Sequence, residues 1–219
     1  MHRYQPILII ACVLVVAIAA GALLLRSNND DTSNADAINP LPEQKKEISP
    51  DTVVMLEEYG DYECAPCGEL HPTLKQLKQE FGPNLNFVFR NLPLPEIHKN
   101  ALVAAQAAEA ARRQNKFWEM HDLLYENQQL WEGEANPRPT FLKFARDLGL
   151  DVDPFTQDMD GEQVRFRIEA DRDEAARRSI DATPTIFIDG RRLRTDALTP
   201  AGIRKRIEAR LAGTDPPGF

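Results

Sequence analysis

The sequence predicts an α/β fold in which short strands flank a block of helices, preceded by an apolar N-terminal segment. Three observations favour this arrangement. Hydrophobic residues make up 42% of the 219 residues and charged residues 27%, which is ordinary for a globular protein. Short apolar runs of strand character alternate with longer segments of helical periodicity. A run of 19 residues without a charge begins at Ile7.

The charge balance and the cysteine content exclude two broad classes. Twenty-six basic and 34 acidic residues give a formal net charge of −8. This argues against nucleic acid as the main partner, because a phosphate-binding surface needs an excess of basic residues. Three cysteines are also too few for a small fold stabilised by several disulfides. A mid-sized folded domain with an added segment remains.

Residues 1–26 are expected to form a single-pass membrane anchor. As a helix, the run from Ile7 to Leu25 is about 28 Å long, close to the ~30 Å hydrocarbon core of a bilayer. The alternative is a cleaved signal peptide, because Ala17-Ile18-Ala19 and Ala20-Gly21-Ala22 resemble cleavage sites. Both sites lie inside the apolar run rather than after it, which favours the anchor.

Residues 27–50 are expected to be a flexible linker. They are rich in Asn, Asp, Ser and Glu, and they include Pro40, Pro42 and Pro50. Such a composition cannot bury enough apolar surface to offset the conformational entropy of the chain. The folded domain is therefore expected to cover residues 51–219.

The first part of this domain predicts a strand, a helix and a second strand. Val53-Val54-Met55-Leu56 is a short apolar run, typical of a strand buried on both faces, and we expect a strand over residues 53–59. From Cys64 to Phe81, apolar residues recur at helical spacing. Gly82-Pro83-Asn84 ends this helix, and residues 85–90 have strand character again.

The remainder predicts a helical block, a hairpin and a last helix. Seven alanines fall within the 11 residues that begin at Ala101. Thr185–Ile188 has strand character, and Asp189-Gly190 is a tight hairpin turn before a returning strand over residues 191–194. We expect helices over residues 101–112, 117–129, 140–148 and 162–178, and a final helix with Ile203, Ile207 and Leu211 on one face.

The chemistry is concentrated at Cys64-Ala65-Pro66-Cys67. Two intervening residues at a strand-to-helix junction place both sulfurs on one helical turn. The unpaired N–H groups and partial positive charge of the helix N-terminus favour a thiolate there. Thiol pKa values in such motifs fall to about 3.5–7.5, from about 8.5 in free cysteine. We expect Cys64 to be the exposed nucleophile and Cys67 the resolving thiol.

Three other uses of the cysteine pair remain open. A zinc site needs further ligands, and His71, His98 and His121 do not recur at the spacing of a zinc finger, so no metal site is expected. A structural disulfide would close only a four-residue loop and contribute little stability. The pair could also be two buried, inert thiols.

Three segments resemble the DsbA-like branch of thioredoxin-fold thiol-disulfide oxidoreductases. They are residues 58–68 around the cysteine pair, residues 117–128 in the helical block, and residues 181–190 at the hairpin. The resemblance covers roughly residues 51–212. It implies a thioredoxin fold with a helical subdomain inserted over about residues 96–160, and the 119-residue gap from Cys64 to Thr183 fits such an insertion.

The resemblance implies roles for three further residues. Pro184 would be a cis-proline that faces the cysteine pair, and the Thr183 backbone would bind an extended substrate. Glu58 would be the acidic residue beneath the site, able to relay protons to Cys67. Glu57 competes for that inward position, because side chains alternate along a strand.

One departure from the family concerns the residues between the cysteines. Strongly oxidising members place proline first and histidine second, whereas here Ala65 comes first and Pro66 second. We therefore expect a less oxidising potential, and the net direction, oxidase or reductase, stays open.

The expected function is that of an extracytoplasmic protein thiol-disulfide oxidoreductase that needs no dissociable cofactor. It would exchange the Cys64–Cys67 disulfide with cysteine-containing protein substrates, and a membrane redox partner would reset the pair. The chain would be anchored in a bacterial cell membrane, with the domain facing the periplasm or cell exterior. The alternative is a non-catalytic, chaperone-like or assembly-factor module that binds through the groove beside Pro184.

Overall fold

The computed structural model describes residues 52–214. The expected membrane anchor (1–26) and linker (27–50) lie outside these residues. Within residues 52–214, no helix combines the length and the apolar character needed to cross a bilayer.

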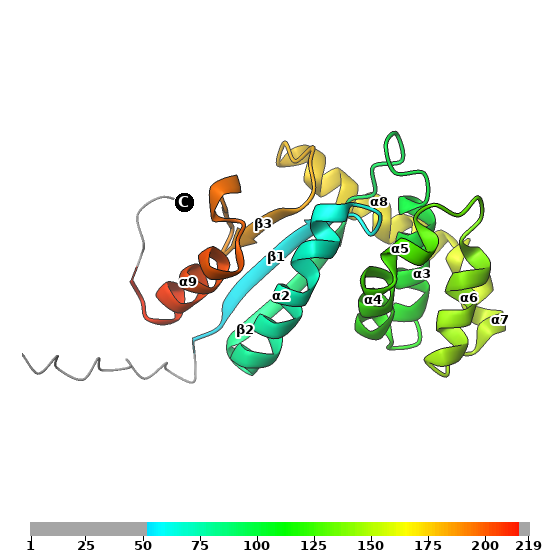
Figure 1. Cartoon of the computed structure of the whole chain (residues 1–219), viewed down its shortest axis with the longest axis horizontal. Helices are drawn as coiled ribbons and strands as arrows, with labels where there is room; N and C mark the ends of the chain where they lie inside the picture. The colour runs from blue at the N-terminus through cyan, green and yellow to red at the C-terminus, as the bar shows by residue number, and fades with distance from the viewer. Residues whose placement is uncertain (1–51, 215–219) are drawn as a thin grey trace, which may run out of the picture. The chain divides into compact units, whose positions relative to one another are not determined.

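Four strands form one mixed sheet in the order β2-β1-β3-β4 (Figure 1). The central strand β1 (Val54–Gly60) pairs in parallel with β2 (Leu85–Asn91) and antiparallel with β3 (Thr185–Ile188). A short strand, β4 (Arg191–Arg192), completes the hairpin. Parallel pairing of β1 with β2 requires a crossover, and helix α2 (Ala65–Phe81) provides it.

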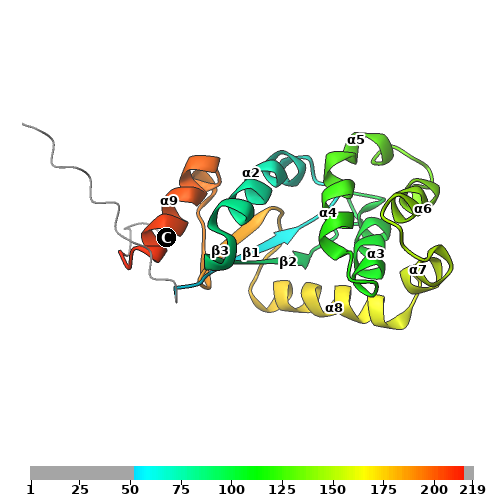
Figure 2. The same ribbon diagram turned by 90° about the horizontal axis from the view of Figure 1, so that it is seen from below.

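Helices cover both faces of the sheet. Figure 2 shows α2 and α9 (Pro200–Leu211) on one side and α8 (Glu162–Arg177) on the other. Val54 and Leu56 of β1 pack against the leucines and isoleucines of α2 and α9. Tyr59 points to the opposite face and packs with Ala175 of α8. Successive side chains of β1 therefore alternate between two faces of the sheet, and both faces are buried.

The helical block lies at one end of the sheet, between β2 and α8 in the chain (Figure 2). The alanines of its first helix are buried, and their small side chains let neighbouring helices approach closely. Large side chains such as Trp131, Phe141 and Phe155 fill the rest of this core. Its helices are α3 (Ala101–Arg112), α4 (Phe117–Glu126), α5 (Gln128–Trp131), α6 (Arg138–Asp147) and α7 (Val152–Met159).

The expected order of elements is confirmed, with three local corrections. The helix expected over residues 117–129 breaks at Asn127, whose side-chain amide donates to the Leu123 carbonyl. Helix α7 was not expected; Asp151 caps it by accepting a hydrogen bond from the Asp153 N–H. The returning strand ends at Arg192 rather than at residue 194, because a 3-10 turn over residues 195–197 follows closely.

Candidate active site

The cysteine pair lies at the N-terminus of α2, directly after β1. Cys64 is the residue before the helix, with extended backbone angles, and its carbonyl accepts hydrogen bonds from the N–H groups of Cys67 and Gly68, both at 3.1 Å. Cys67 lies one turn into the helix and is fully buried. The side chains are free thiols. The CxxC geometry expected from the sequence is therefore present.

Cys64 is less exposed than the sequence predicted. Only 5% of the residue is accessible, because the loop before β3 covers its sulfur. The Cys64 thiol donates to the Thr183 carbonyl over 3.4 Å, across 119 residues of sequence. An attacking group must therefore approach along this loop.

The two thiols ionise very differently. A hydrogen bond from the Cys67 thiol is the main reason that the pKa of Cys64 falls to about 6. The Thr183 side chain and the Cys67 backbone N–H lower it further, against the effect of burial. The pKa of Cys67 is raised well above its ordinary value, first by burial and then by its bond to Cys64. At neutral pH, Cys64 is mostly thiolate and Cys67 is protonated.

The loop that faces Cys64 contains a cis peptide bond between Thr183 and Pro184, as the family resemblance implied. Thr185 fixes the loop by donating its hydroxyl to the Ala182 carbonyl at 2.8 Å. The Thr183 hydroxyl is buried and has no hydrogen-bond partner among the described residues. It is therefore free to donate to a thiolate at Cys64.

Glu58, rather than Glu57, points toward the cysteines. Glu58 is 1% exposed, and burial is the main reason that its pKa rises to about 8, with a smaller contribution from Cys64. One of its carboxylate oxygens has no hydrogen-bond partner among residues 52–214. Its charge in turn raises the pKa of Cys67. Glu58 is thus close enough to both thiols to affect their ionisation.

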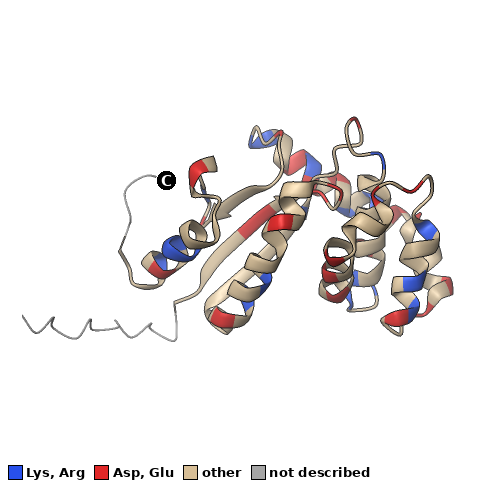
Figure 3. Ribbon diagram, viewed as in Figure 1, with Lys and Arg blue, Asp and Glu red and all other residues tan. Residues whose placement is uncertain are grey.

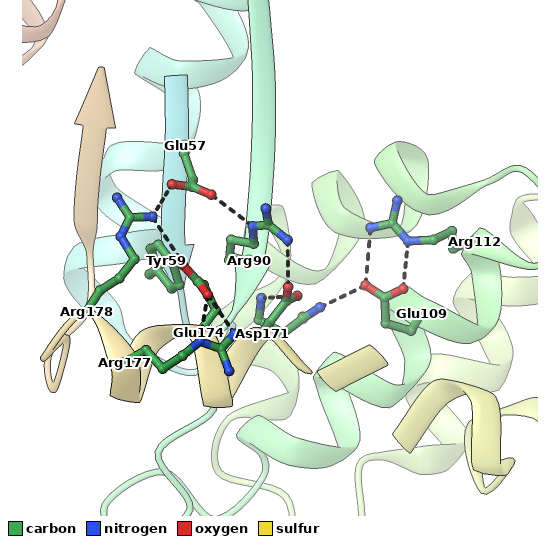
Figure 4. A network of polar contacts seen from close by, with 10 residues as sticks. Glu57, Tyr59, Arg90, Glu109, Arg112, Asp171, Glu174, Arg177 and Arg178 are labelled. Atoms are coloured by element: carbon green, nitrogen blue, oxygen red, sulfur yellow. Dashed lines mark hydrogen bonds and ion pairs between the residues drawn. The ribbon is translucent and has the colours of Figure 1, made fainter. Parts of the chain in front are cut away.

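Glu57 is buried as well, on the opposite face of the sheet. Its carboxylate accepts from Arg90 Nε at 2.9 Å and from Arg178 Nη1 (Figure 4). As strand alternation requires, only one of the two glutamates faces the cysteines. Glu57 is buried at the other face of the sheet, where it pairs with Arg178.

A groove lies between the start of α2 and the loop that contains Pro184. Its volume is about 540 Å³. Leu70, Pro184, Leu193 and Leu198 give it an apolar lining, while Glu69 and Arg192 add charges of opposite sign. It is large enough for one or two side chains of an extended peptide placed beside Cys64.

The helical block holds the active-site turn through a residue that the sequence did not single out. Gln128 donates its side-chain amide to the carbonyls of Tyr62, at 2.8 Å, and Cys64, at 3.0 Å. A side chain at position 68 would overlap this amide, since a Cβ there would lie 2.8 Å from the Gln128 Oε1. Gln128 falls within the family-like segment 117–128, which was the only signal available.

Asp61 organises the segment before Cys64. Its buried carboxylate accepts from the N–H groups of Glu63 (2.8 Å) and Leu94 (2.9 Å), and His98 Nδ1 lies 2.9 Å away. His98 therefore belongs to this turn. The other two histidines considered in the sequence, His71 and His121, come together elsewhere with Asp122. These three form the only group within residues 52–214 that has the arrangement of metal ligands.

Comparison with known sequences identifies the family. The model of the family described as Thioredoxin matches residues 49–209. The chain is also 44% identical over 139 residues to the Na(+)/H(+) antiporter NhaA 1 of Salinispora arenicola, covering 64% of this chain and 20% of that one. The chain is also 37% identical over 166 residues to the Na(+)/H(+) antiporter NhaA of Herminiimonas arsenicoxydans. This alignment covers 75% of this chain and 25% of that one. The chain spans about a fifth to a quarter of the length of these relatives.

Solved structures agree with this result. BdbD from Bacillus subtilis is 25% identical and superposes with a TM-score of 0.64 over 74% of this chain and 90% of that one. Two further structures share the fold. α-DsbA2 from Wolbachia pipientis is 20% identical, with a TM-score of 0.61 over 73% of this chain and 83% of that one. MdbA from Corynebacterium diphtheriae is 20% identical, with a TM-score of 0.58 over 76% of this chain and 85% of that one. The chain therefore belongs to the thioredoxin family and has the fold of DsbA-like proteins, with a helical subdomain inserted into it.

Proposed function

We propose that the domain exchanges disulfides with cysteine-containing protein substrates and that Cys64 is the sulfur that reacts with them. The observation that carries this proposal is the opposite ionisation of two adjacent thiols: the pKa of Cys64 is about 6, and that of Cys67 lies well above its usual range. In such a pair, the sulfur with the low pKa is both a good nucleophile and a good leaving group. The second sulfur stays protonated until it resolves the mixed disulfide.

In the oxidising direction, a substrate thiolate attacks the Cys64 sulfur of the Cys64–Cys67 disulfide. The bond between the two cysteines breaks, a mixed disulfide forms, and Cys67 leaves with the electron pair and takes up a proton. A second substrate thiolate then attacks the substrate sulfur of the mixed disulfide. The substrate leaves with its new disulfide, and Cys64 departs as a thiolate. Its low pKa makes it a good leaving group.

Glu58 is the proposed proton carrier for Cys67. Its pKa of about 8 lets it donate or accept a proton near neutral pH. In the reducing direction the Cys64 thiolate attacks a substrate disulfide. Cys67 then loses its proton to Glu58 and resolves the mixed disulfide. The same residues thus serve both directions.

Thr183 and Pro184 are the proposed substrate-binding residues. A substrate segment that lies extended along the loop before β3 would bring its cysteine to Cys64 and place neighbouring side chains in the apolar groove. We further propose that the domain works outside the cytoplasm, attached to a bacterial membrane through residues 7–25, where a membrane redox partner resets the pair.

Trapping experiments on the full chain test the order of attack. With a disulfide-containing peptide, Cys67→Ser is expected to accumulate a stable mixed disulfide at Cys64, whereas Cys64→Ser accumulates none. A mixed disulfide at Cys67 of the Cys64→Ser chain, at the same yield, would contradict the proposal. Equilibration with glutathione buffers then gives the reduction potential, which decides between net oxidase and net reductase.

The alternative, a non-catalytic binding module, is tested in cells. A strain that lacks the protein is complemented with the Cys64→Ser chain. Loss of complementation is expected from the redox proposal, and full complementation would favour binding without turnover.

A further inference from the structure

A second group of chemically reactive side chains lies between α2 and α4. His71 belongs to α2, one turn beyond Cys67, while His121 and Asp122 belong to α4. Each offers one ligand atom, and the three atoms lie within 4.8 Å of one another. His71 is 4% exposed and His121 is 2% exposed. Two buried imidazoles beside a carboxylate form an arrangement that metal ions use.

The Nε2 atom of His71 is unpartnered. It is buried and has no hydrogen-bond partner among the described residues. The closest acidic atoms are Asp122 Oδ1 at 3.5 Å and Glu126 Oε1 at 3.9 Å, both beyond ordinary hydrogen-bond length. Buried polar atoms in native proteins almost always have a partner, so an unpartnered nitrogen here is consistent with a bound ion or water molecule. Two ligands of one tetrahedral zinc ion, each about 2.0–2.1 Å from the metal, are about 3.4 Å apart. The 3.5 Å between His71 Nε2 and Asp122 Oδ1 is close to this ligand-to-ligand distance.

The other two side chains are oriented by neighbours. The Tyr62 hydroxyl lies 3.1 Å from Nδ1 of His121, which leaves Nε2 as the nitrogen available to a metal. Lys75 lies 2.8 Å from Oδ2 of Asp122, which leaves Oδ1 to face His71. Partners on the far atom of each ligand are characteristic of protein metal sites.

Two lysine side chains of α2 border the group. The Lys75 ammonium, which pairs with Asp122, also contacts Glu126 at 2.7 Å. Lys78 lies above the Trp118 ring, 3.4 Å from its centroid.

An opening leads to this group. A cavity of about 340 Å³ is lined by His71, His121 and Asp122 together with aromatic side chains and the two lysines Lys75 and Lys78. It has room for an ion to enter and for a water molecule as a further ligand. A site with three protein ligands and one open position is the usual form of an accessible zinc site.

We propose that His71, His121 and Asp122 bind one divalent transition-metal ion, with Zn²⁺ as the best match to two imidazoles and a carboxylate. A water molecule from the cavity would complete the tetrahedron. This proposal departs from the expectation that the chain has no metal site; the ligands come from two helices and share no motif spacing. The proposal does not depend on the redox function of the cysteine pair.

Zinc binding is measured on the full chain with Cys64→Ser and Cys67→Ser, so that neither active-site thiolate can hold the ion. Competition with a chromophoric chelator is expected to give one bound Zn²⁺ that is lost on His71→Ala, with affinity at least tenfold lower, the lower end of the range for loss of a supporting partner. The matched control is Glu119→Gln, an exposed carboxylate of α4, which is expected to leave affinity unchanged. Circular dichroism verifies that each variant is folded, and Asp122→Asn replaces His71→Ala if the latter is not.

A further variant separates a metal site from a purely structural cluster. Lys75→Gln removes the ammonium that competes with the ion for Asp122, so zinc affinity is expected to rise roughly fivefold or more. Cobalt(II) bound in place of zinc is expected to show the visible bands of a tetrahedral nitrogen and oxygen site. Absence of Zn²⁺ binding in the parent chain, unchanged affinity on His71→Ala, or weaker binding on Lys75→Gln would each overturn the proposal.

Discussion

The two active-site thiols are chemically identical, and their surroundings make them different. Cys64 lies at the N-terminus of α2, where the Cys67 thiol and the Thr183 side chain stabilise the negative charge of its thiolate. Cys67 is enclosed by the core beside Glu58, where a negative charge is unfavourable. A shift of one pKa unit corresponds to about 1.4 kcal/mol, so these contacts decide which sulfur reacts.

Thr183→Val tests the contribution of the loop to this difference. The variant keeps the shape of the side chain and the backbone carbonyl but removes the buried hydroxyl. The pKa of Cys64 is expected to rise above about 6, and alkylation by iodoacetamide at pH 6 to slow by roughly twofold, as for half a pKa unit. Thr195→Val, at an exposed position of the same groove, is the control. Equal alkylation rates in the parent chain and Thr183→Val would contradict the role of the hydroxyl.

Glu58→Gln is expected to change how stability depends on pH. In the reduced native protein the pKa of Glu58 is about 8, against 4.5 ordinarily, so between these values the native state holds a proton that the unfolded chain has lost. The free energy of unfolding of the parent chain therefore falls as pH rises from 5 to 8, by at most about 1.4 kcal/mol per pH unit, and the loss is complete above pH 8. The free energy of unfolding of Glu58→Gln does not fall in this way, because glutamine has no carboxyl group to ionise.

Urea unfolding at pH 5, 6.5 and 8 under reducing conditions measures the effect. The advantage of Glu58→Gln over the parent chain is expected to grow at each step, whereas Glu96→Gln, at an exposed loop position, follows the parent. Parallel pH profiles for Glu58→Gln and the parent would show that this carboxyl ionises normally.

Much of the candidate site could be predicted from local sequence. The spacing of Cys64 and Cys67 and their place at a helix start already indicate which thiol is more acidic. The Thr183 carbonyl and the Gln128 amide contact Cys64 from 119 and 64 residues away, and no local pattern specifies such contacts. For the same reason the sequence overestimated the exposure of Cys64, which the loop before β3 covers.

At the scale of elements, Gly60 allows the end of β1 to approach the helical block. A Cβ at this position would overlap the ring of Phe89 in β2 and would lie 2.9 Å from the Tyr125 hydroxyl of α4. That hydroxyl donates to the Asp61 carbonyl just before the active-site turn. The absence of a side chain at Gly60 thus brings strand, helical block and cysteines together.

Gly60→Ala is expected to destabilise the domain by about 1–3 kcal/mol, the usual cost of forcing extra atoms into a packed core. Gly133→Ala is the matched control, because a Cβ there meets no atom within 4 Å. Denaturant unfolding of both variants gives the comparison. A Gly60→Ala chain as stable as Gly133→Ala would mean that the packing around Gly60 is loose.

Long periodic elements were predictable, and short ones were not. Helix α3 begins and ends where its alanine-rich pattern indicates, at Ala101 and Arg112. Helix α7 has eight residues, two of them aspartates and one a proline, which locally resembles a loop. Its helical form depends on packing of Phe155 and Met159 into the core of the helical block. Tertiary contacts therefore decide such segments.

At the scale of the whole domain, a network of charged and polar side chains, most of them buried, links the sheet to the helical block (Figure 4). Glu57 and Asp171 both accept from Arg90, and Asp171 also accepts from the Asn91 N–H at 3.1 Å. The Asn91 side chain then donates to Glu109 of α3 at 2.8 Å. The network connects β1, β2, α8 and α3, and thereby fixes the helix that precedes the Pro184 loop.

Asp171→Ala is expected to destabilise the domain by about 1–3 kcal/mol, because it removes the buried acceptor of the Asn91 N–H and leaves Arg90 with Glu57 as its carboxylate partner. Asp171 is 1% exposed, whereas Asp173 on the same helix is exposed, so Asp173→Ala is the control. Thermal unfolding compares the two. Equal melting temperatures for both variants would indicate that Arg90 finds another partner or water.

Charge content alone could not single out this network. In the view of Figure 3, acidic and basic residues are interspersed along the helices, and α8 is dense in both. Most of these residues are exposed, and Asp171 looks no different from them in the sequence. Its position is set by the crossing of α8 over β2, a feature of the assembled domain.

The central claim, that one thiol of the pair is activated and the other is held protonated, is tested most directly by thiolate absorbance at 240 nm. The reduced full chain and its Cys64→Ser variant are titrated from pH 4 to 10, and the difference between them is taken. One transition with a midpoint near pH 6 that disappears in Cys64→Ser is the expected result. A titration without any transition below pH 8, or one that persists unchanged in Cys64→Ser, would contradict the claim.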